Sequence, residues 1–152
     1  MAADLRLITS ILKMNTDLER MGDHAVNIAE RALNIIHRPE INDVDFPKMV
    51  IAVSQMLSDA LNSFMREDTE MARVVLTQDD RIDQFNDEIY ERVTQVMEQN
   101  PNLIKTGVSF LIVAHNLERI ADLANNIAED VIYMKIGKEV RHRVEQKVDP
   151  TN

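Results

Sequence analysis

The sequence predicts an all-α fold, an extended antiparallel bundle of four long helices. Apolar residues recur at helical spacing over almost the whole 152-residue chain. Only three glycines and four prolines interrupt them, and no segment has the alternating apolar and polar residues of a half-buried strand. The segments between the periodic stretches are short, and short connections place successive helices antiparallel. The length suits one ordinary domain.

The first helix is expected within residues 1–38, because Pro39 stops it. Its apolar positions are alternately four and three residues apart and form a heptad stripe: Leu7, Ile11, Met14, Leu18, Met21, Ala25, Ile28, Ala32 and Ile35. A second apolar row beside this stripe widens the apolar arc to about 160° of the helix. A face of this width is not expected to stay in water. The helix should therefore pack on the remainder of its own chain or swap into a second copy.

Two further helices are expected before Asn100. Asp45 is placed to cap the second helix, which carries Pro47 in its first turn. A polar turn at residues 66–69 ends that helix, and Asp68 or Thr69 within the turn can cap the third. The third helix is expected to run without interruption to Asn100.

The fourth helix is expected from Pro101 to Ile136. Proline is well tolerated at the first position of a helix, and Gly137 is suited to the left-handed conformation of a C-terminal cap. Residues 138–152 form a charged tail that we expect to fray.

The composition excludes several classes of protein. The formal net charge is −9, from 26 acidic and 17 basic side chains, so we expect no nucleic-acid partner and no docking on anionic lipid. No apolar run reaches the roughly 18 residues of a membrane span, so direct membrane insertion is not expected. Without cysteine the chain has no disulfide, no thiolate metal site and no cysteine nucleophile.

An internal repeat with an offset of 99 residues is the strongest signal in the sequence. Residues 17–33 align with residues 116–132, and nine of the seventeen positions are identical. Helical packing alone explains the apolar identities, but polar residues also recur in register: Glu19 and Glu118, Arg20 and Arg119, Asp23 and Asp122, Asn27 and Asn126, and Glu30 and Glu129. A duplicated helical module is the simplest explanation.

Carboxylates spaced four residues apart mark candidate metal sites. Such residues share one face of a helix and repel each other when both are charged, and a cation between them relieves the repulsion. Three pairs stand at or near apolar faces: Glu19 with Asp23, Asp79 with Asp83, and Glu118 with Asp122. In an antiparallel bundle the second pair can face the third. Oxygen ligands of this kind suit Mg²⁺, Ca²⁺, Mn²⁺ or iron.

Two alternatives remain open from the residues alone. The carboxylates can instead pair with Arg20 and Arg119, which describes a metal-free helical scaffold or interaction protein. A carboxylate di-iron enzyme needs Glu-x-x-His on two helices, and the one such motif is Glu139 to His142 in the charged tail. No nucleophile and base stand in a recognisable arrangement, so no enzymatic activity is predicted.

The repeated motif resembles the PhoU family, regulators of phosphate-specific transport. The resemblance rests on Leu18-Glu-Arg-Met-Gly-Asp23 and Leu117-Glu-Arg-Ile-Ala-Asp122, and it extends over about residues 3–143. It implies repeats of three-helix bundles that carry clusters of iron or zinc on acidic motifs. By matching motif, Glu19 and Asp23 belong to one metal site. The other site takes these residues: Asp79, Asp83, Glu118 and Asp122.

The same resemblance divides the chain into three parts. Residues 1–38 correspond to the last helix of a first repeat that lacks its other two helices, residues 45–137 to a complete three-helix repeat, and residues 138–152 to the tail. The implied function is that of a cytoplasmic, non-enzymatic regulator of phosphate uptake and phosphate-starvation signalling. It would link the phosphate ABC transporter ATPase to a sensor histidine kinase. A homodimer, with or without helix swapping, is expected.

Overall fold

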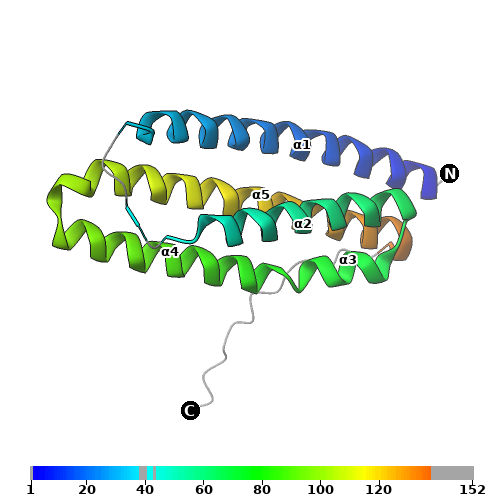
Figure 1. Ribbon diagram of the computed structural model, residues 1–152. Helices are drawn as coiled ribbons and strands as arrows, with labels where there is room; N and C mark the ends of the chain where they lie inside the picture. Colours follow the sequence, from blue (N-terminus) through cyan, green and yellow to red (C-terminus); the bar gives the residue numbers. More distant parts are fainter. Residues whose placement is uncertain (1, 38–40, 43, 138–152) are drawn as a thin grey trace, which may run out of the picture.

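The computed structural model describes residues 2–37, 41–42 and 44–137, and the described chain is all-α, as predicted. Figure 1 shows long helices that lie side by side in an extended bundle. The elements in chain order are α1 (Ala2–Ile35), α2 (Phe46–Arg66), α3 (Thr69–Leu76), α4 (Asp79–Gln99), the 3₁₀ turn η1 (Pro101–Leu103) and α5 (Ile104–Ile136). Pro39 and the tail at residues 138–152 lie outside the described residues.

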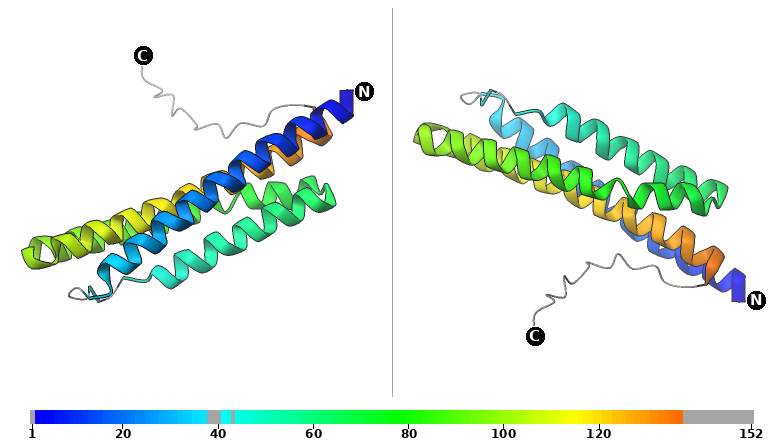
Figure 2. Two further views of the ribbon diagram at one scale, coloured as in Figure 1. Left: turned by 90° about the horizontal axis from the view of Figure 1, so that it is seen from above. Right: turned by 90° about the horizontal axis from the view of Figure 1, so that it is seen from below.

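Helix α5 is the centre of the bundle. It packs against α1, α2, α3 and α4, whereas α1 packs mainly against α5 (Figures 1 and 2). Small residues such as Ala124 and Ala128 on α5 are fully buried and let neighbouring helices approach closely. The largest fully buried apolar side chains come from four of the helices: Met49, Met56, Val75, Ile82, Val93, Ile127, Val131 and Ile132.

The predicted helix ends are confirmed at three places. The Asp45 carboxylate accepts a hydrogen bond from the backbone N–H of Lys48 at the start of α2. The Asp68 carboxylate accepts from the N–H groups of Glu70 and Met71 at the start of α3, at 3.0 Å each. Gly137 ends α5 with a φ of 68°, where a residue with a side chain would be strained. Each cap satisfies backbone groups that the helix leaves unpaired.

The third predicted helix is interrupted, which corrects the expectation of one continuous helix. At Thr77 and Gln78 the backbone N–H groups bond three residues back instead of four, and the Thr77 hydroxyl donates to the Val74 carbonyl at 2.7 Å. The chain therefore restarts as α4 with Asp79 and Asp80 in its first turn. Negative charge is stabilised there by the dipole at the N-terminus of the helix.

Helix α1 uses only part of its predicted apolar arc within the chain. Met21 is buried against the core, and Met14 and Ile28 on the same row are partly buried there. The neighbouring rows remain exposed, including Ile11 and Leu33. Helix α1 thus packs on α5 of its own chain, but this contact covers only one edge of the apolar arc of α1.

Among the described residues, no helix is both long enough and apolar enough to cross a membrane.

The two glycines inside helices allow a matched test of packing. A Cβ at Gly22 would meet nothing within 4 Å, so Gly22→Ala should raise the free energy of unfolding by roughly 0.5–1 kcal/mol through helix propensity. A Cβ at Gly107 would lie 2.5 Å from Met97 Sδ and 3.2 Å from Val93 Cγ1. We expect Gly107→Ala to be less stable than Gly22→Ala by about 1 kcal/mol or more, because the site is already full. Urea unfolding at low protein concentration measures both, and equal stability of the two variants would contradict this packing.

Candidate functional site

Four carboxylates from two helices come together where α4 begins. Asp79 and Asp83 lie on α4, and Glu118 and Asp122 lie on α5; we call these four residues the acidic cluster. Desolvation of the Asp83 carboxyl raises its pKa above the ordinary value, and the negative charges of Asp79, Glu118 and Asp122 raise it further. The second and third predicted pairs therefore do face each other across the α4–α5 interface.

Protein groups already contact the two carboxylates on α5. Arg119 donates a hydrogen bond to Asp122 at 3.1 Å. The Glu118 carboxylate accepts from the Asn86 amide at 3.1 Å and lies 3.4 Å from Nδ1 of His115. The predicted pairing of an arginine with these carboxylates is present, and Asn86 and His115 were not predicted.

The donor chemistry of the acidic cluster suits a hard cation, but its side chains are not arranged around one. Carboxylate oxygens are the ligands that Mg²⁺, Ca²⁺ and Mn²⁺ prefer. In the part of the chain that the structure describes, no three His, Asp or Glu side chains converge closely enough to hold a metal ion. Glu118 and Asp122 are partly exposed, so their side chains can turn without disturbing the core. Metal binding therefore requires such a rearrangement.

The first predicted pair lies apart from the acidic cluster. Glu19 and Asp23 are exposed on α1, on the part of that helix that α5 does not cover. No second acidic pair faces them within the described residues, which therefore place two carboxylates here and not four.

A groove runs beside the acidic cluster, between α1 and α5. It has a volume of about 560 Å³, and both acidic and basic side chains line it, Asp79 and Asp122 together with Arg20 and Arg119. Asn125 also lines this groove, and its buried Oδ1 has no hydrogen-bond partner among the residues that the structure describes.

The α1–α5 interface contains buried polar groups that the sequence reasoning did not single out. Burial raises the pKa of Asp130, and Lys13 Nζ, 3.1 Å from the carboxylate, lowers it in part. Burial likewise raises the pKa of Asp17, whereas Arg20 opposes the rise. Helical periodicity predicts apolar residues at such an interface and therefore gives no signal for Asp17 or Asp130.

These polar contacts follow the internal repeat. The side chain of Asp17 hydrogen-bonds Asn126. The residues at equivalent positions of the repeat, Asn116 and Asn27, also contact each other, with Nδ2 of Asn27 3.5 Å from Oδ1 of Asn116. His24 Nδ1 lies 2.8 Å from the same Asn116 oxygen. The two copies of the repeated segment are thus packed on each other about an approximate two-fold axis.

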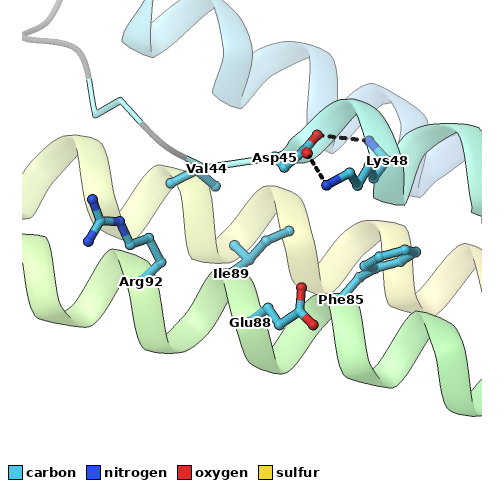
Figure 3. A pocket seen from close by; sticks show the side chains of 7 residues that line it. All are labelled: Val44, Asp45, Lys48, Phe85, Glu88, Ile89 and Arg92. Carbon is cyan, nitrogen blue, oxygen red and sulfur yellow. Dashed lines mark hydrogen bonds and ion pairs between the residues drawn. The ribbon is translucent and has the colours of Figure 1, made fainter.

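A smaller pocket lies between the start of α2 and α4, as Figure 3 shows. Its volume is about 110 Å³, and it combines Phe85 and Ile89 with the charged side chains of Lys48, Glu88 and Arg92. Lys48 also forms an ion pair with the capping Asp45 at 2.7 Å. The acidic and basic side chains that line the pocket balance each other, so the pocket has no preference for an anionic or a cationic ligand.

Comparison with known proteins gives one consistent match. The model of the PhoU domain family matches residues 1–32 and 46–131. A phosphate-specific transport system accessory protein PhoU homolog from Pseudomonas putida is 41% identical over 93% of this chain and 56% of its own length. A protein of the same name from Aquifex aeolicus is 38% identical over 93% of this chain and 65% of its own length. The chain thus spans less than two thirds of these relatives.

Solved structures agree with this match. The crystal structure of the phosphate transport system regulatory protein PhoU from Streptococcus pneumoniae superimposes with a TM-score of 0.86 at 30% identity, over 93% of this chain and 67% of that one. The PhoU crystal structure from Pseudomonas aeruginosa gives the same TM-score at 34% identity, over 91% of this chain and 67% of its own.

The buried Asp130 carboxylate predicts a pH-dependent loss of stability when its partner is removed. Lys13→Met removes the ammonium that lowers the pKa of Asp130, so that pKa should rise further. At pH 7 the unpaired carboxylate should cost about 1–2 kcal/mol of unfolding free energy. Since the folded state then binds the proton more tightly than the unfolded state, the stability should return as the pH falls toward 3.8.

Thermal unfolding between pH 4 and 8 measures this effect. Lys48→Met is the control, because it removes an ion pair between two exposed residues and should change little at any pH. If the Tm of Lys13→Met changes with pH in parallel with the Tm of the parent chain, the pairing of Lys13 with the buried Asp130 is contradicted.

Proposed function

This chain belongs to the PhoU family, and we propose that it acts as an accessory protein that regulates phosphate transport. The observation that carries the proposal is the family match over both copies of the repeated segment. The relatives are named for an accessory or regulatory role, which supports a function through binding and not through catalysis.

We further propose how the regulation works. The chain would act in the cytoplasm, bind the ATPase of a phosphate ABC transporter and a sensor histidine kinase, and keep phosphate-starvation genes silent while phosphate is plentiful. The long helices with exposed apolar side chains support this role, because helical faces are a common means of recognising partner proteins.

We propose that the acidic cluster binds a cation. Asp79, Asp83, Glu118 and Asp122 would hold it, as Mg²⁺, Mn²⁺ or Ca²⁺ by donor chemistry or as an iron or zinc cluster by family resemblance. The pKa of Asp83, raised by desolvation and further by the charges of Asp79, Glu118 and Asp122, supports this proposal, since a cation would stabilise the charged carboxylates. The bound metal would supply positive charge that holds α4 to α5. Glu19 and Asp23 would belong to a second site that needs ligands from elsewhere.

A metal-free scaffold is the second candidate. The contacts of Arg119 with Asp122 and of Asn86 with Glu118 favour it, because they satisfy both carboxylates without a cation. This candidate keeps the same regulatory role.

The regulatory role predicts a phenotype in cells. In a bacterium without its own PhoU-family protein, expression of this chain should lower a phosphate-starvation reporter at high phosphate. The expected result is repression of several fold. The same chain with Met56→Asp in its core should fail to repress, because a buried charge unfolds the bundle. No difference between the two chains would contradict the role.

The metal proposal predicts selective loss of binding. Glu118→Gln combined with Asp122→Asn should weaken Mn²⁺ or Zn²⁺ binding at least about tenfold and remove the rise in Tm that the metal produces. The matched control is Glu91→Gln combined with Asp87→Asn, an exposed pair four residues apart on α4 with the same change of charge. Elemental analysis and thermal melting with and without chelator provide the measurements. Equal metal content in the two variants would support the metal-free candidate. Absence of metal from the parent chain and from both variants would also support it.

A further inference from the structure

The groove between α1 and α5 brings together the two arginines of the internal repeat. Arg20 on α1 and Arg119 on α5 occupy equivalent positions of the repeat, and both line this groove of about 560 Å³. An arginine side chain is well suited to an oxyanion, because its planar guanidinium group can donate two parallel hydrogen bonds. Two residues that lie 99 positions apart in the sequence thus supply cationic donors to one groove.

Hydrogen-bond acceptors line the same groove. Asn125 is 7% exposed, and its Oδ1 has no hydrogen-bond partner within the described part of the chain. The carboxylates of Asp122 and Glu129 also line the groove. A buried acceptor without a partner is destabilising, so a ligand that donates a hydrogen bond to Asn125 Oδ1 gains binding free energy there. The groove therefore suits an oxyanion that also carries a hydrogen-bond donor.

Inorganic phosphate has both properties near pH 7. Its negative oxygens accept hydrogen bonds from arginine, and it keeps at least one O–H group that can donate to an amide or carboxylate oxygen. Sulfate has no O–H group at this pH. Phosphomonoesters have a second pKa of about 6, so most of their molecules have lost the remaining proton at pH 7. The unpartnered acceptor of Asn125 therefore favours the free phosphate ion over both.

We propose that this groove binds inorganic phosphate. Arg20 and Arg119 donate hydrogen bonds to the phosphate oxygens, and Asn125 Oδ1 accepts the hydrogen bond of the phosphate O–H group. This inference rests on the proposed role in phosphate transport and supplies its signal, the phosphate ion itself. Because one arginine comes from each helix, the bound ion connects α1 to α5. Occupancy of the groove thus stabilises the packing of α1 on α5, which gives the chain a response to phosphate.

Carboxylates beside the two arginines compete with the ligand. Asp122 accepts a hydrogen bond from Arg119 at 3.1 Å, and Asp17 lies 4.0 Å from the guanidinium group of Arg20. Asp122→Asn removes one competing charge but keeps an oxygen that can accept from the phosphate O–H group. We therefore expect Asp122→Asn to bind phosphate severalfold more tightly than the parent chain. A groove that binds a cation would show the opposite change.

Isothermal titration calorimetry of the full chain with potassium phosphate, at pH 7 and with chelator present, measures the binding. The parent chain is expected to bind phosphate with a Kd below about 1 mM, and sulfate and phenyl phosphate at least about tenfold more weakly. Arg20→Gln and Arg119→Gln should each weaken phosphate binding at least about tenfold. Arg73→Gln is the matched control, because Arg73 is about as exposed as Arg119 and also pairs with an acidic residue, Glu70. This control should leave the Kd for phosphate unchanged.

Asn125→Leu tests the acceptor separately from the fold. Leucine has a similar size and no polar atom, so the Tm should not fall. The preference for phosphate over sulfate should be lost, because the phosphate O–H group then has no buried acceptor at this position. If Asn125 has a structural role alone, the Tm falls and the preference stays, which would contradict the proposed contact.

Three results would overturn the proposal. They are the absence of saturable phosphate binding up to about 10 mM, binding of sulfate or phenyl phosphate as tight as that of phosphate, and weaker phosphate binding by Asp122→Asn. Repression of the phosphate-starvation reporter by a chain that binds no phosphate would overturn this inference and leave the regulatory role intact. Phosphate binding by a chain that does not repress the reporter would contradict the regulatory role and support the groove as a phosphate site.

Discussion

The burial of α5 on almost all sides is the constraint on which the rest of the structure depends. Its small residues, among them Ala121, Ala124 and Ala128, let α2, α3 and α4 pack on one side and α1 on the other. Every contact between α1 and the remaining bundle passes essentially through this helix. The position of each candidate site therefore depends on how α5 is placed between its neighbours.

The same packing determines which carboxylates can act together. Glu118 and Asp122 stand on α5 where α4 begins, and the break at Thr77 and Gln78 brings Asp79 to the first turn of α4. The acidic cluster thus stands on two rigid helices, and its two α5 members, Glu118 and Asp122, are partly exposed. Desolvation and, after it, the repulsion of the neighbouring carboxylates raise the pKa of Asp83, and a bound cation would relieve that repulsion.

Polar contacts decide the register of α1 on α5. Apolar rows alone allow one helix to slide by a turn along another, but the buried Asp130 must meet Lys13 and the buried Asn116 must meet His24. These pairs favour a single register because other registers leave buried polar groups without partners. The approximate two-fold relation of the repeated segments follows from that register.

The sequence by itself determined the helical class, the caps at Asp45, Asp68 and Gly137, and the internal repeat with its acidic pairs, because periodicity, capping and repetition are local properties of the chain. It also predicted that Asp79 and Asp83 face Glu118 and Asp122. Only the tertiary structure decided which row of α1 is buried, where the third helix breaks and which buried polar groups meet between α1 and α5. The physical reason is that an apolar arc in the sequence predicts a surface that can be buried. Which part of that surface is buried depends on the helices that pack against it.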